Sequence, residues 1–356
     1  MIILGIHDGH NCGVSIFEDG KLLLALNEER ITRNKNEYGF PLQSINYCLK
    51  YFNLKKKDIN FIAVSTKNLP PKYFVVKRNT SFSIEDYKKE QDSYWYQKIY
   101  KKKKVKYLKL FSKKKVSKKK LFYDLRYVKN EDDVVGMRNA RLNGISNFFN
   151  LSKKKIFFFD HHQCHAYYGY YSSDFYQKKS IIVTSDGGGD GSNGSIWLAK
   201  KNKIKELYRT NICNIGRMYR YATLNLNMKP TEHEFKVMGL AGYALKNNAF
   251  FGKLENFYSK TLDVKNAKFF YKLKPKDNYF YFKNLSKNIR FDTLAYFIQN
   301  FTENILEKWF LQIYDKYKIK NFIFSGGVAQ NIKATKKIST NKKINKLFVP
   351  PGPGDE

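Results

Sequence analysis

Short apolar runs alternate with polar turns over the first fifty residues of the chain. Residues 1–6 and 13–17 are apolar, and a turn rich in Gly, His and Asn separates them. Glu18-Asp19-Gly20 supplies hairpin chemistry, because Asp-Gly is a strong turn dipeptide, and residues 21–27 form a third apolar run. From Pro41 to Phe52 the apolar positions recur at helical spacing. The pattern predicts three strands joined by turns and followed by a helix.

The same order of elements returns later in the chain. Residues 180–188, 194–200 and 204–210 predict three more strands separated by Gly-rich turns, and an internal repeat of one supersecondary unit indicates a duplicated fold. Each opening resembles the ribonuclease-H-like unit of the actin and sugar-kinase superfamily, in which the first hairpin wraps nucleotide phosphates. The resemblance implies an α/β protein of two ribonuclease-H-like domains with a nucleotide cleft between them.

We place the boundary between the two lobes near residue 175. The first lobe, residues 1–175, is expected to carry a Lys-rich helical insertion at about 80–150. The second lobe, residues 176–356, is expected to be incomplete at its C-terminus, because the chain stops directly after a further loop.

The basic charge of the chain is concentrated in lysine. The formal net charge is +35, and residues 101–120 hold twelve Lys and no acidic residue, with Val105, Leu108 and Phe111 spaced for one helix face. This stretch is either a solvated helix or an arm that binds polyanions. Only 10 of the 66 basic residues are Arg, whose forked side chain is the usual reader of bases. A Lys-, Asn- and Tyr/Phe-rich composition is also what an AT-biased genome produces, so the solvated helix is favoured over nucleic-acid binding.

The cysteine pattern and the hydropathy favour a cytoplasmic protein. Four cysteines show no CxxC pairing, which fits a reducing compartment. Only six residues precede the first polar turn, and no run of 18 apolar residues occurs, so neither a signal peptide nor a membrane span is expected.

Three of the six histidines lie within five positions. His161 and His165 would stand one turn apart on a helix and could bind one metal ion between them. The zinc-protease pattern requires Glu after the first His, but His162 occupies that place, so peptide hydrolysis is not expected. The alternative is a polar helix with incidental histidines.

Two glycine-rich turns follow predicted strands. In the first, the backbone N–H groups of Gly187 and Gly188 could approach a phosphate, and Asp186 could hold a metal ion. In the second, small residues would let a ligand lie against the backbone; the candidates there are Gly326, Gly327, Val328 and Asn331. His10, beside Asn11 in the first turn, is a candidate general base, although lone histidines are more often structural.

Five segments in the same order resemble the carbamoyltransferases of the nodulation-protein-U and antibiotic O-carbamoyltransferase type. They are HNCGVSIFEDGKLLLALNEERITRNKNEYGFP, DHHQCHAYYGYYSSDF, GRMYRYATLNLNMKPTEHEFKVMGLAGY, FSGGVAQNIKATKKI and PPGPGD. The resemblance covers essentially the whole chain and implies the fold of the universal tRNA threonylcarbamoyl-adenosine enzyme.

The resemblance also implies roles for individual residues. His161 and His165 match iron-type metal ligands, with Asp186 and Asp355 completing the site. His10 matches a histidine that assists transfer, Lys35 matches a basic residue near the carbamoyl-nucleotide, and the turn at 326–331, like Asn11 in the first turn, is expected to contact the nucleotide.

By the same resemblance, carbamoyl phosphate and ATP give carbamoyl-adenylate, whose carbamoyl group passes to a hydroxyl of a sugar-like acceptor. The family's YrdC-like part, to which the resemblance assigns adenylate formation, is absent from this sequence. The chain is then either a fragment or one subunit of a split enzyme whose YrdC-like part is a separate chain. Two other hypotheses are an inactive nucleotide- and metal-binding module and a Lys-rich polyanion binder.

Overall fold

A computed structural model describes residues 1–245 and 258–355 of the chain, which divides into two compact units. The first unit consists of Met1–Phe82, Asp92–Cys164 and Asp355, and the second consists of Ser83–Gln91 and His165–Gly354. The division falls within the helix α9, His161–Tyr171, which lies before the boundary that we expected near residue 175. That these units are separate domains stays a prediction.

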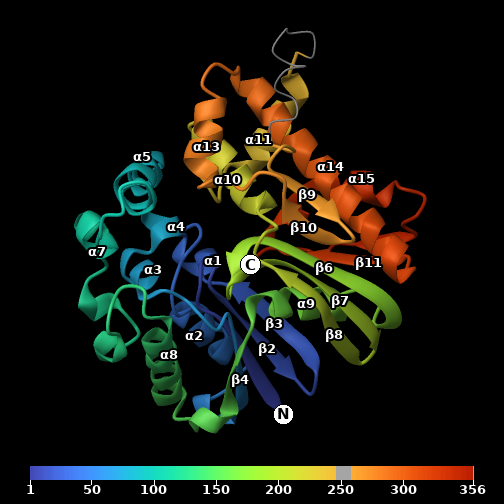
Figure 1. The fold of residues 1–356 in the computed structure, drawn as a ribbon. Coiled ribbons are helices and arrows are strands. Elements are labelled where there is room, and N and C mark those ends of the chain that lie inside the picture. Colours follow the sequence, from blue (N-terminus) through green and yellow to red (C-terminus); the bar gives the residue numbers. More distant parts are fainter. Residues whose placement is uncertain (246–257, 356) are drawn as a thin grey trace. The chain divides into compact units, whose positions relative to one another are not determined.

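The sheet of the first unit has five strands in the order β3-β2-β1-β4-β5 (Figure 1). The strands are β1 (Ile2–His7), β2 (Gly13–Glu18), β3 (Lys21–Asn27), β4 (Ile59–Ser65) and β5 (Ile156–Phe159). The first three pair antiparallel, whereas β4 and β5 join parallel to β1. Asp19 and Gly20 both have positive φ at the β2–β3 turn, so the predicted Asp-Gly hairpin is confirmed.

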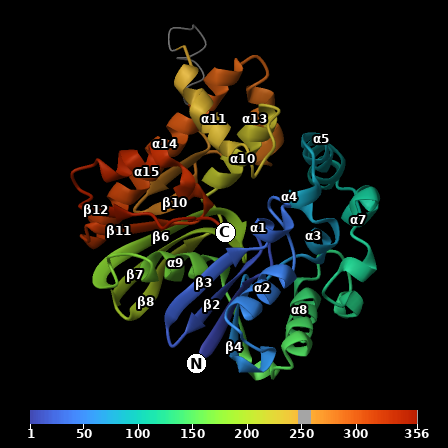
Figure 2. The ribbon, with the colours of Figure 1, turned by 180° about the vertical axis from the view of Figure 1, so that it is seen from behind.

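The sheet of the second unit repeats this topology, in the order β8-β7-β6-β11-β12 (Figure 2). The strands are β6 (Gln177–Gly189), β7 (Ser192–Lys201), β8 (Lys203–Thr210), β11 (Asn321–Ser325) and β12 (Lys346–Phe348). Again three strands pair antiparallel and two join parallel. The duplicated ribonuclease-H-like fold expected from the internal repeat is therefore confirmed.

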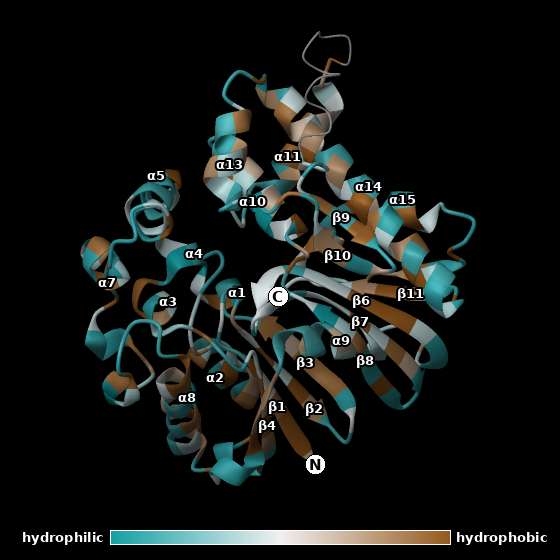
Figure 3. Cartoon of the chain, viewed as in Figure 1, coloured by the Kyte–Doolittle hydropathy of each residue, from teal (hydrophilic) through white to brown (hydrophobic). Residues whose placement is uncertain are grey.

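The apolar run in β6 is continuous because the strand is buried on both faces. Ile181 and Val183 pack with the helical core that includes Trp309, while Ile182 packs on the opposite side with Tyr170 of α9. In the first unit, alternate residues of β1 and β2 enter a core shared with α2 (Leu42–Tyr51) and α8 (Val134–Phe149). Figure 3 shows the hydrophobic residues concentrated on strands such as β1, β4 and β11.

Most of the remaining elements are short. In the first unit they are α1 (Glu29–Thr32), α3 (Pro71–Val76), α4 (Arg78–Ser81), α6 (Tyr96–Ile99) and α7 (Tyr107–Leu110). In the second they are α5 (Ile84–Lys89), α10 (Ile215–Asn225), α11 (Glu234–Leu240), β9 (Leu262–Lys265), β10 (Lys268–Tyr271), α13 (Asn278–Leu285), α14 (Phe291–Tyr317) and α15 (Ile332–Ser339). A π-helix spans Glu90–Trp95, and single 3-10 turns lie at Lys56–Asp58, Ser112–Lys114, Lys118–Lys120, Leu125–Tyr127, Lys153–Lys155, Ala241–Tyr243 and Gly327–Gln330. Within residues 1–245 and 258–355, no helix is both long and apolar enough to cross a membrane.

The single helix expected over residues 101–120 is wrong. This stretch contains only α7 and two 3-10 turns, and it is anchored by the buried side chains of Tyr107 and Phe111. Helices gain stability from pairs of opposite charge four residues apart, whereas like charges at that spacing repel. Twelve lysines without an acidic partner in the same stretch therefore oppose a continuous helix.

The lysines of this stretch should bind nucleic acid only weakly. Lys101–Lys104 and Lys118–Lys120 are exposed, which allows nonspecific attraction to phosphates. We expect a Kd for random duplex DNA no tighter than about 10⁻⁵ M near physiological salt, and a steep loss of affinity as salt rises. Fluorescence anisotropy over a salt series measures both. Replacing Lys118–Lys120 by Gln should reduce the salt dependence of the DNA affinity no more than the same replacement of the exposed Lys153–Lys155 does. Tight binding that persists at physiological salt would favour a nucleic-acid function.

Candidate functional site

The turn between β1 and β2 carries His10 and Asn11 and is held from two sides. The backbone of His10 pairs with that of Tyr38 in an isolated antiparallel β-bridge, and the Cys12 N–H donates to the Glu37 carbonyl at 3.0 Å. On the other side, burial lowers the pKa of His7, which favours its neutral ring. That ring donates from Nε2 to the His10 carbonyl at 2.8 Å and contacts the Ser65 hydroxyl through Nδ1 at 2.5 Å. The backbone of His10 is thus fixed.

Asn11 combines a left-handed backbone with an unsatisfied side-chain acceptor. It adopts a left-handed φ of 57°, and its Oδ1 atom is buried without a hydrogen-bond partner among the described residues. A buried acceptor of this kind costs free energy unless a ligand or water satisfies it.

One carboxylate of the first unit lies against two predicted site histidines. Asp355 Oδ2 is 3.2 Å from Nδ1 of His10, and Asp355 Oδ1 is 3.6 Å from Nε2 of His161. The Asp355 and His161 side chains are 8% and 7% exposed, whereas that of His10 is 34% exposed. His10 can therefore be reached from solvent while its partner carboxylate is sheltered.

Helix α9 carries both predicted metal-binding histidines. It begins at His161, where the Asp160 carboxylate accepts a hydrogen bond from the N–H of Gln163 at 3.1 Å, as an N-cap does. Because an α-helix has about 3.6 residues per turn, His161 and His165 stand about one turn apart. In the second unit, His165 Nε2 lies 3.8 Å from Asp186 Oδ2.

Within each pair, the two atoms lie farther apart than a hydrogen bond allows but close enough to bind the same metal ion. Two ligand atoms that each lie about 2.1 Å from one ion can be separated by up to about 4.2 Å. The separations of 3.6 Å for His161–Asp355 and 3.8 Å for His165–Asp186 fall within this limit and exceed hydrogen-bond length. Imidazole and carboxylate ligands suit iron, zinc or manganese.

The second glycine turn packs directly against the Asp186 loop. A Cβ atom on Gly326, whose φ is 93°, would lie 2.4 Å from the Ser185 carbonyl, and one on Gly327 would lie 2.8 Å from Asp186 Oδ1. The Gly326 N–H also donates to the Pro353 carbonyl at 2.7 Å, which anchors the loop that precedes Asp355. These glycines are required for close approach of the chain to itself.

The other predicted residues of this turn have structural contacts. Val328 is buried, and the Asn331 side chain caps α15 by accepting from the Ala334 N–H at 3.1 Å. Asn331 also exchanges hydrogen bonds with the side chain of Gln299 at 2.9 Å. Their contact with a nucleotide stays a prediction.

Lys35 is exposed in a turn, two residues before the Glu37 whose carbonyl pairs with the first turn. A second basic group near these loops, which was not among the residues predicted from the sequence, is Arg217 of α10. Its Nε donates to the Gly187 carbonyl at 2.7 Å, and its Nη2 lies 2.8 Å from the place that a Cβ of Gly188 would occupy. Arg217 could have been predicted from the sequence, because it is a cation in the segment GRMYRY, which belongs to one of the segments that resemble the family.

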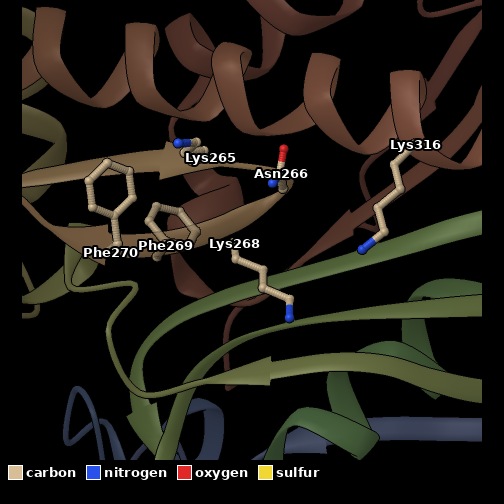
Figure 4. Close-up of a pocket in the computed structure, with 6 residues that line it drawn as sticks. All are labelled: Lys265, Asn266, Lys268, Phe269, Phe270 and Lys316. Atoms are coloured by element: carbon tan, nitrogen blue, oxygen red, sulfur yellow. The ribbon is translucent and has the colours of Figure 1, made fainter.

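A separate hollow of about 550 Å³ lies in the second unit on the β9–β10 hairpin and α14 (Figure 4). It is lined by Lys265, Asn266, Lys268, Phe269, Phe270 and Lys316. None of the predicted site residues lines it.

Two curated proteins are similar to this chain in sequence, one over its whole length and one over a short part. An uncharacterised protein of Methanocaldococcus jannaschii is 29% identical over 367 residues, which cover 100% of this chain and 55% of that protein. The nodulation protein NolNO of Sinorhizobium fredii is 38% identical over 58 residues, which are 16% of this chain and 8% of that protein. The chain thus spans about half the length of the first of these relatives.

Solved structures with similar backbones include the Acidaminococcus fermentans (R)-2-hydroxyglutaryl-CoA dehydratase component A. The TM-score is 0.48 at 12% identity, covering 99% of this chain and 93% of that one. Full-length HypF in its phosphate- and nucleotide-bound form gives a TM-score of 0.43 at 11% identity, covering 99% of this chain and 44% of that one.

The family is decided by the match over the whole length of the sequence. Residues 2–356 match the family described as carbamoyltransferase N-terminus, and they include every residue discussed above. The chain belongs to the carbamoyltransferase N-terminus family.

Proposed function

We propose that this chain transfers a carbamoyl group from carbamoyl-adenylate to a hydroxyl of a sugar-like acceptor. The observation that carries the proposal is the position of Asp355, whose two oxygens lie 3.2 Å from His10 and 3.6 Å from His161. A candidate base and a candidate metal ligand thus share one sheltered carboxylate, in a chain of the carbamoyltransferase N-terminus family.

In the proposed step, the acceptor oxygen attacks the carbamoyl carbon and forms the new C–O bond. The bond from that carbon to the adenylate oxygen breaks, and its electron pair leaves with AMP. His10 takes the acceptor proton, which a neutral imidazole can do near pH 7. Because Asp355 contacts His10 at Nδ1, the Nε2 atom is the one that receives the proton.

The metal site of this proposal consists of His161, His165, Asp186 and Asp355, each of which offers one ligand atom. Both histidines come from α9, and each lies near a carboxylate of its own unit, Asp355 for His161 and Asp186 for His165. A divalent ion bound there, with iron as our first expectation, would polarise a carbamoyl or phosphate oxygen.

The adenylate is proposed to contact the first turn and the glycine-rich loops. Asn11 offers its buried acceptor, Gly187 and Gly188 offer backbone groups, and Arg217 adds a positive charge beside them. The turn at 326–331 contributes the remaining contacts, and Lys35 lies near the carbamoyl-nucleotide.

Carbamoyl-adenylate is proposed to come from carbamoyl phosphate and ATP through a YrdC-like part that is not among residues 1–356. The purified chain should therefore bind ATP but release no pyrophosphate from ATP and carbamoyl phosphate. Calorimetry measures the first and a coupled pyrophosphate assay the second. Adding the C-terminal part of a full-length relative should start pyrophosphate release. Robust release by this chain alone would show that the activating chemistry has been assigned to the wrong region.

A further inference from the structure

Thr66 has an unusual backbone conformation at the carboxyl end of β4. It is a β-branched residue with a φ of 66°, in the left-handed region that such residues avoid, and it is 3% exposed. Strained residues persist where the surrounding structure fixes them, and they are concentrated at functional sites.

Arg141 of α8 fixes the backbone around Thr66. Its guanidinium donates to the Thr66 carbonyl at 2.9 Å and to the Lys67 carbonyl at 3.1 Å. The same group makes two hydrogen bonds to Asp8, at 2.6 and 2.7 Å, and both side chains of this pair are fully buried. Tyr123 donates a further hydrogen bond to Asp8 at 2.6 Å.

This buried ion pair ties together the ends of two neighbouring parallel strands. Asp8 follows β1, and Thr66 and Lys67 follow β4. One guanidinium therefore binds both loops, through two hydrogen bonds to the Asp8 carboxylate and through hydrogen bonds to the backbone carbonyls after β4. A buried pair with its remaining donors satisfied is rigid, because any displacement would leave a charge unpaired.

The consequence is a defined place for the Thr66 hydroxyl, which lies 3.2 Å from Nδ1 of His161. The opposite ring atom, Nε2, is the one that lies 3.6 Å from Asp355. Metal-binding histidines commonly donate their second ring N–H to a fixed acceptor, which sets the tautomer and the ring orientation.

We propose that Thr66 is a positioning residue that accepts the Nδ1–H of His161 and so keeps the Nε2 lone pair available as a ligand, with Asp8 and Arg141 holding Thr66 in place. The inference rests on the proposed role of His161 in the metal site. The proposal also accounts for the strained φ of Thr66. Glycine would adopt this φ without strain, but it has no hydroxyl to accept the hydrogen bond.

Arg141 is a poor test, since removing one partner of a buried ion pair destabilises the whole fold. Thr66→Val keeps the shape and removes only the hydroxyl, and Thr66→Ser restores the hydroxyl. Thr184→Val is the matched control, because it removes a buried hydroxyl that bonds to Ser195 in the second unit.

The first readout is the tautomer of His161. The chain has six histidines, so ¹⁵N-histidine labelling gives a countable set of imidazole signals at about pH 8.5, where neutral rings dominate. The wild type, Thr66→Ser and Thr184→Val should show His161 protonated at Nδ1, and Thr66→Val should show a mixture. Wild-type signals in Thr66→Val, or an Nε2-protonated wild type, would overturn the proposal.

The second readout is the Kd for Mn²⁺, measured by electron paramagnetic resonance. Thr66→Val should weaken binding by about 10- to 100-fold, as loss of an outer partner of a ligand does, and Thr66→Ser should recover it. Equal Kd values for Thr66→Val and the wild type would overturn the proposal. Absence of Mn²⁺ binding in every variant would instead contradict the metal site itself, and the imidazole signals would then decide the role of Thr66.

Discussion

Replacing His10 by Asn should lower carbamoyl transfer by about 10²- to 10⁴-fold, the range that a general base contributes. Asparagine can still donate a hydrogen bond to Asp355, which lies 3.2 Å from His10 Nδ1 in the wild type, but it cannot take a proton near pH 7. The rate is measured as transfer of a labelled carbamoyl group in the presence of the C-terminal part of a full-length relative, which supplies carbamoyl-adenylate.

The affinity for ATP should be nearly unchanged in the same variant, because a base acts mainly in the transition state. His233→Asn is a suitable control, since it removes an imidazole in the second unit that bonds to the Lys229 N–H. Wild-type transfer by His10→Asn, or an equal loss in both variants, would remove His10 from the proposed mechanism.

The second large effect concerns the metal ion. Purified without chelator, the wild type should contain about one divalent ion per chain, and the double variant His161→Ala/His165→Ala should contain none. Both imidazoles lie one turn apart on α9, so removing them takes away half of the proposed ligands. Elemental analysis gives the content and the identity of the ion.

Retention of the ion by the double variant would show that it binds elsewhere. Asp186→Asn should weaken binding without abolishing it, because an amide oxygen remains as a neutral ligand. His233→Ala serves again as the control, with an unchanged metal content expected.

The sequence predicted the fold well because its signals are local. The apolar runs before and after Asp19-Gly20 lie next to each other along the chain, and the same turn chemistry recurs at Asp190-Gly191, where both residues have positive φ. The pairing of His161 with His165 was equally local, since it needed only a helix.

The contacts that the sequence did not reveal are long-range. Arg141 lies 75 residues from Thr66 and 133 residues from Asp8 in sequence, and no periodicity or spacing links them. Asp355 and Lys35 were placed near a site only by family resemblance. The prediction of one helix over residues 101–120 is wrong for another reason: the apolar spacing favours a helix there, but repulsion among the lysines opposes it.

The central claim is that this chain passes a carbamoyl group to a hydroxyl, and label transfer tests it most directly. Carbamoyl phosphate carrying ¹⁴C is incubated with ATP, this chain, the C-terminal part of a full-length relative, and a panel of sugars and glycosides. We expect stable labelled carbamates that depend on ATP and on this chain, and that are lost with His10→Asn. The claim would be contradicted if pyrophosphate release continued while no acceptor became labelled and all of the label was lost as carbon dioxide.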